Sequence, residues 1–134
     1  MANQMFSKGR QGFLDGSIDW DTDDIRCMLA LSSYTFDDSD MYVSDLGAVD
    51  NGRSAALSGK TVVDGVADAA DTSLAATAAT SSKAIIIFKH TGSDATARLI
   101  VYVDAPTAGL PFTPSSGQTV NITWNDGTNK IFKL

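Results

Sequence analysis

The acidic residues of this chain constrain its fold more than any other feature, because all 16 are aspartate and none is glutamate. Glutamate favours helix interiors, whereas aspartate bonds to nearby backbone groups and favours turns and helix caps. The chain also has 11 glycines and is rich in threonine, serine and valine, which are residues of turns and strands. This composition predicts short strands joined by turns, and it removes glutamate from every catalytic scheme.

The length of 134 residues fits one domain. We expect residues 16–134 to form a single β-sandwich-like domain, preceded by residues 1–15 as a short helix or an N-terminal arm. Phe6 and Phe13 are seven residues apart and would share one helix face, with Gly16 ending the helix. Gly9 and Gly12 weaken a helix, so an extended arm is the alternative.

Apolar alternation identifies the strands. Residues 25–31 alternate with the period of a sheet, and residues 84–88 and 98–104 are apolar on both sides, as in interior strands. Asp-Gly and Asn-Asp-Gly sequences predict two hairpins, one turning at residues 64–65 and the other at residues 125–127. The remaining predictions are a short strand at 17–20, a helical turn at 41–46, a turn at 50–52 and an exposed, mobile loop at 75–82.

Together these segments make a mainly β fold, an antiparallel sandwich or small barrel of about seven or eight strands with one or two short helices.

The charge distribution argues against nucleic acid as a partner. The formal net charge is −6, and the ten basic residues are scattered without forming a run, whereas phosphate binding needs clustered lysine and arginine. The longest apolar stretch, residues 84–88, is too short to cross a bilayer, so we expect no membrane association. The first ten residues lack the apolar core of a secretion signal, and a single cysteine excludes an internal disulfide. We expect synthesis in a reducing cytoplasm.

The turn at residues 19–24 has alternating aspartates, as a calcium loop does. Counting from Asp19, an EF-hand needs glycine at the sixth position and glutamate at the twelfth, where this chain has Asp24 and Ala30. The motif fails, and a weaker site shared with residues 37–40 remains only an alternative to turn capping.

Two residues could in principle support catalysis. His90 is the only histidine and stands at a strand end, with no nucleophile elbow in the sequence. Cys27 lies on the apolar face of a strand, where a buried, inert thiol is the expected state. We therefore predict no catalytic, cofactor-binding or metal-binding residue, no cofactor and no enzymatic activity. Five aromatic residues could line a sugar-binding face or fill the core: Trp20, Tyr34, Tyr42, Tyr102 and Trp124.

Three segments carry a resemblance to a known family. Residues 12–25 (GFLDGSIDWDTDDI), residues 57–71 (LSGKTVVDGVADAAD) and residues 110–134 (LPFTPSSGQTVNITWNDGTNKIFKL) together span much of the chain. They resemble a family of small structural proteins encoded among the virion genes of tailed bacteriophages. The resemblance implies a virion component rather than a reaction, and it carries over no binding residues.

Within a virion, we expect a capsid decoration (cement) protein that stabilises the head shell. It would form a homo-oligomer and bind the major capsid protein or other virion proteins. The candidate assembly contacts are Met5, Phe6 and Phe13, because residues 1–15 offer little local structure to hide them. The alternatives are a neck, tail-tip or fibre-associated adaptor, and a glycan-binding host-surface adhesin.

Overall fold

The structure is a computed structural model that describes residues 4–104 and 112–134. Its strands are β1 (Gln4–Met5), β2 (Ile25–Leu31), β3 (Asp50–Arg53), β4 (Thr61–Val63), β5 (Val66–Asp68), β6 (Thr72–Ala75), β7 (Ser82–Lys89), β8 (Leu99–Val103), β9 (Thr119–Ile122) and β10 (Phe132–Lys133). The helices are α1 (Ser7–Asp15) and the short 3-10 helix η1 (Val43–Leu46). All strand pairs are antiparallel. The predicted mainly β, antiparallel fold is thus confirmed, with ten described strands rather than seven or eight.

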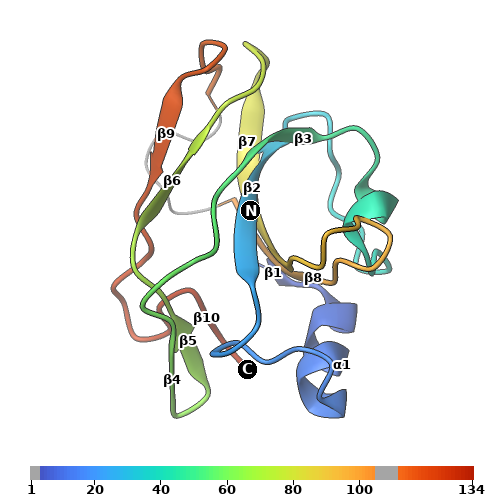
Figure 1. The fold of residues 1–134 in the computed structure, drawn as a ribbon, viewed down its shortest axis with the longest axis vertical. Helices are drawn as coiled ribbons and strands as arrows, with labels where there is room; N and C mark the ends of the chain where they lie inside the picture. The colour runs from blue at the N-terminus through green and yellow to red at the C-terminus, as the bar shows by residue number, and fades with distance from the viewer. Residues whose placement is uncertain (1–3, 105–111) are drawn as a thin grey trace.

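A five-stranded sheet in the order β1-β8-β7-β2-β3 forms the centre of the molecule. Two smaller sheets, β10-β5-β4 and β6-β9, lie over one of its faces, while α1 and η1 lie on the other side in Figure 1. The sheets are open, so the arrangement is layered rather than a closed barrel. This is the sandwich alternative of the sequence prediction.

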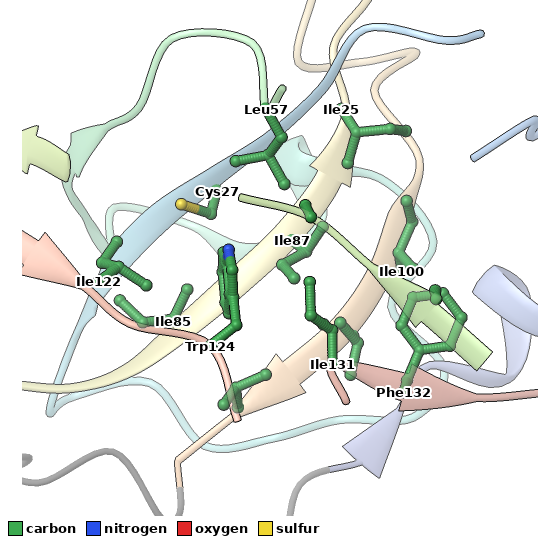
Figure 2. Packing of buried hydrophobic residues seen from close by; sticks show 14 of the residues in the cluster. Ile25, Cys27, Leu57, Ile85, Ile87, Ile100, Ile122, Trp124, Ile131 and Phe132 are labelled. Carbon is green, nitrogen blue, oxygen red and sulfur yellow. The ribbon is translucent and has the colours of Figure 1, made fainter. Parts of the chain in front are cut away.

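Both faces of the central sheet are buried because its middle strands alternate between two apolar clusters. On β2, Ile25, Cys27 and Leu29 enter the first cluster, whereas Met28 and Ala30 enter the second. The first cluster draws side chains from strands of all three sheets, as Figure 2 shows around Trp124. The loop after β2 covers the second. The predicted strand at residues 25–31 and the predicted interior strands at 84–88 and 98–104 are therefore confirmed.

The hairpin predicted around residues 64–65 is also confirmed. Val63 pairs with Val66 across a two-residue turn, in which Asp64 and Gly65 both have positive φ (51° and 78°). This is the conformation of the type I′ turn that Asp-Gly favours.

The second predicted hairpin is wrong. β9 pairs with β6, and β10 pairs with β5. Trp124 explains the separation, because its backbone N–H donates to Asp71 Oδ1 (2.9 Å) and its indole Nε1 donates to Ala70 O (3.0 Å). These bonds hold the chain against the β5–β6 connection after β9, so residues 125–131 cross to another sheet instead of folding back.

Three shorter predictions also need correction. Residues 17–20 form no strand, although Ile18 and Trp20 are buried. Residues 50–52 belong to β3 rather than to a turn. The loop at 75–82 is largely exposed as predicted, but the buried Asn51 side chain bonds to it at several points. The predicted helical turn at 41–46 is present as η1.

Residues 7–15 form the helix alternative of the sequence prediction, ending at Gly16 with φ of 82°. Gly9 and Gly12 face inward, and a β-carbon at Gly9 would lie 2.7 Å from Ile100 O. Gly9 therefore lets α1 approach β8 closely, whereas a β-carbon at Gly12 would overlap the Ile18 side chain. The buried Arg98 completes this contact by donating to Ser17 Oγ (3.2 Å) and to Lys8 O.

Candidate functional site

The N-terminal residues predicted to contact a partner are used mainly within the fold. Met5 pairs with Val101 in β1 and is 7% exposed, and Phe6 has no exposed surface. The Phe6 ring packs against Phe36 with centroids 4.9 Å apart. The premise that little local structure hides these two side chains is wrong, because pairing of β1 with β8 carries them into the core.

Phe13 differs from the other two because it is only partly buried. Its ring lies 5.6 Å from that of Phe132, where the end of α1 meets the C-terminal strand. It lines an apolar hollow of about 400 Å³ with Ile18, Trp20, Val62, Ala67, Phe132 and Leu134. We call this feature the apolar hollow; Gly16, Asp19 and Gly65 also line it.

The rim of the apolar hollow exposes large apolar side chains. Val62 and Leu134 are each 51% exposed. Val63, the next residue of β4, is 64% exposed and lies on the other face of the hairpin, beside Val66 and Lys133. Exposed apolar side chains at the rim of a hollow make this surface a candidate for protein association.

β4 is also the last strand of its sheet, which has the order β10-β5-β4. Thr61, Val62 and Val63 are all exposed, and none is charged or a proline. Natural proteins usually protect edge strands with charges, prolines or bulges. β4 has none of these within its length, and its pairing with β5 has no register shift.

A second concavity of about 670 Å³ lies beside β1 and the start of α1. Arg10, Lys130 and Lys133 bring positive charge to it, and Asp38 is its one acidic residue. Asp38 is engaged locally, since Ser7 donates to its carboxylate from both the backbone N–H (2.8 Å) and the hydroxyl. This concavity is therefore lined mainly by polar and basic residues, unlike the apolar hollow.

Four of the five aromatic residues considered for sugar binding are buried: Trp20, Tyr34, Tyr102 and Trp124. The two indoles donate to neighbouring backbone carbonyls, Trp20 Nε1 to Asp68 O and Trp124 Nε1 to Ala70 O, both at 3.0 Å. Both indoles pack in the core, as the second of the two roles expected from the sequence, and they hold the end of β5 and the β5–β6 connection.

The aspartates of residues 19–24 satisfy local backbone groups and cations. Asp19 Oδ1 accepts from the Asp21 N–H (3.1 Å), and Asp23 pairs with Lys89 (3.0 Å). The hydrogen bonds from Arg26 hold the pKa of Asp24 below its ordinary value. Among residues 4–104 and 112–134, no group of three or more potential metal ligands is arranged to hold an ion.

Cys27 is buried beside Ser54, whose hydroxyl lies 3.4 Å from the thiol sulfur. Burial raises the pKa of the Cys27 thiol to about 11.

Because the thiolate is the reactive species, we expect the Cys27 thiol of native protein at pH 8 to resist iodoacetamide, and to be labelled fully when the protein is unfolded in urea. The raised pKa adds stability below the ordinary pKa of 9.0, and this contribution is lost as the pH rises through about 11. Labelling of native protein at the rate of a free thiol would contradict this burial.

The residues of this surface that the sequence did not single out are Val62, Val63 and Leu134. The hairpin predicted around residues 64–65 makes residues 61–63 a strand, but it does not say which strand ends a sheet. The sequence does predict Phe13 as a contact residue, but in an N-terminal arm rather than as one wall of a hollow.

No protein-family model, curated protein or solved structure matches this chain. No described helix has both the length and the apolar character needed to span a membrane.

Proposed function

We propose that the protein is a non-enzymatic structural component of a tailed-phage virion, and that it decorates the capsid by binding the major capsid protein. The family resemblance of three segments suggests the virion. The observation that carries the binding role is the apolar hollow, flanked by the exposed β4 edge.

Covering this surface with a partner protein is favourable on physical grounds. Removing apolar surface from water contributes roughly 25 cal/mol per Å², and a pocket with a packed floor loses little side-chain entropy on binding. Trp20 and Phe132 form such a floor, because their rings meet edge to face with centroids 5.2 Å apart. A partner inserting apolar side chains here would meet a preformed surface.

The charge of the protein fits a role on a protein shell. A net charge of −6 keeps the free protein soluble and disfavours nucleic acid, whereas a basic protein surface would attract it. Oligomerisation would multiply the contacts made with a repeating shell and so strengthen weak individual sites.

Binding through the hollow can be tested with one charge placed on its rim. We expect Leu134→Asp to reduce co-sedimentation of the purified protein with capsids that lack it by at least about tenfold, because a buried, unpaired carboxylate costs several kcal/mol. The matched control is Thr119→Asp, which adds the same charge at an exposed position on β9, away from β4 in Figure 1. Equal binding by both variants would exclude the hollow as the contact.

A further inference from the structure

The backbone groups of Val62 face away from the molecule. Ala67 is the residue opposite Val62 in the β4–β5 pair, and its carbonyl accepts from the Ile131 N–H (3.1 Å) on the other side. In an antiparallel ladder, the N–H and C=O of one residue point to the same neighbouring strand. Because those of Ala67 point toward β10, Val62 and Ala67 form a non-hydrogen-bonded pair. The N–H and C=O of Val62 therefore point to the open edge.

The sequence around Val62 is complementary to itself in the antiparallel direction. If a second copy of β4 lies beside the first with Val62 opposite Val62, Thr61 lies opposite Val63, and Lys60 opposite Asp64. Threonine and valine are favourable cross-strand neighbours, as are residues of opposite charge. The segment from Lys60 to Asp64 thus matches its own copy in charge, and the three strand residues between these two charges are all β-branched.

The flanking charges are available for this pairing. Asp64 is exposed at the turn, and Lys60 is partly exposed, with its ammonium donating to the backbone carbonyl of Asp23. An ammonium has three donors, so this one bond leaves the Lys60 ammonium able to meet a carboxylate of the second copy.

We propose that β4 pairs with β4 of a second copy about a two-fold axis through Val62. The contact is isologous, and it joins the two three-stranded sheets into one sheet of six strands. It satisfies the open N–H and C=O of Val62 in both copies and covers Val62 and Val63. Because the axis is perpendicular to the joined sheet, the two apolar hollows open on the same side.

This pairing goes beyond the proposed function, since it concerns the isolated protein and needs no virion. If it fails, the capsid-binding proposal is left intact. If it holds, a dimer that presents two hollows to one side would contact two shell subunits at once.

Charge exchange tests the register directly. We expect wild-type protein to dimerise with rising concentration in sedimentation velocity. We expect Lys60→Asp alone, and Asp64→Lys alone, to raise the dissociation constant by about tenfold or more, because each brings like charges together in both symmetric pairs. An equimolar mixture of the two variants restores opposite charges in both pairs, so it should dimerise like wild type.

The mixture also separates a broken interface from a broken fold, since misfolded variants would not recover on mixing. Circular dichroism melts of each variant check folding independently. A wild-type protein that stays monomeric at all concentrations would overturn the proposal. So would single variants that dimerise normally, or a mixture that fails to recover while both variants remain folded.

Discussion

Changing Asn51 to alanine is expected to lower the free energy of unfolding by about 3 to 4 kcal/mol, several times the loss of an average hydrogen bond. The Asn51 side chain has no exposed surface. Its Nδ2 donates to Ser82 Oγ (2.9 Å) and to the carbonyls of Ala78 and Thr80, and its Oδ1 accepts from the Ala78 N–H (2.8 Å). Alanine would remove all of these bonds and leave a cavity under the loop at 75–82.

Hydrogen exchange would locate the loss. The Ala78 amide, which depends on Asn51 Oδ1, is expected to exchange much faster in the variant, while amides of β7 change only through global stability. Asn121→Ala is the matched control, because Asn121 is exposed on β9. Similar urea midpoints for Asn51→Ala and wild type would show that the loop is not held by this side chain.

Changing Gly9 to alanine is the second substitution expected to have a large effect. Helix propensity alone would predict a gain in stability, whereas we expect a loss. In an exposed helix, alanine is more favourable than glycine by about 1 kcal/mol. Here the new β-carbon would lie 2.7 Å from Ile100 O, 2.8 Å from Leu99 O and 2.9 Å from Ile100 Cα. All three are backbone atoms of β8, which cannot rotate away, so α1 has to move.

We expect Gly9→Ala to lower the free energy of unfolding by about 2 to 3 kcal/mol, in the range of overpacked cores. The displacement would also strain the bond from the Phe6 N–H to Ile100 O (3.0 Å). Gly127→Ala is the matched control, since the nearest atom to its new β-carbon belongs to the exposed Asn125 side chain. A Gly9→Ala protein more stable than wild type would show that α1 does not pack closely on β8.

The parts of the fold that the sequence predicted are those with local signals. Alternation over residues 25–31 identified β2 because it has the two-residue period of a sheet. Asp64-Gly65 identified a hairpin because that dipeptide suits two positive φ angles. Neither inference needed knowledge of distant residues.

The errors arose where distant contacts overrode local ones. Residues 125–127 carry a strong turn signal, yet bonds from Trp124 to Ala70 and Asp71 direct the chain to a different sheet. Glycine at positions 9 and 12 weakens an isolated helix, but in the folded protein Gly9 permits the close contact with β8 and Gly12 makes room for the Ile18 side chain. The burial of Met5 and Phe6 likewise depends on pairing with β8, which no local pattern reveals.

The same limit applies to the candidate surface. The sequence identified strand residues at 61–63, but whether a strand is central or at an edge follows from the whole sheet order. Only the assembled fold brings Phe13, Val62 and Leu134 to one hollow, from three segments far apart in the sequence.

The most direct test of the proposed virion role is quantitative mass spectrometry of purified particles of a tailed phage whose genome encodes this chain, with heads and tails separated. A capsid decoration protein is expected in the head fraction alone, at a copy number near that of the major capsid protein. A few copies in the tail or neck fraction would contradict decoration and favour an adaptor or a host-surface adhesin. Absence from both fractions would contradict a structural role in the virion.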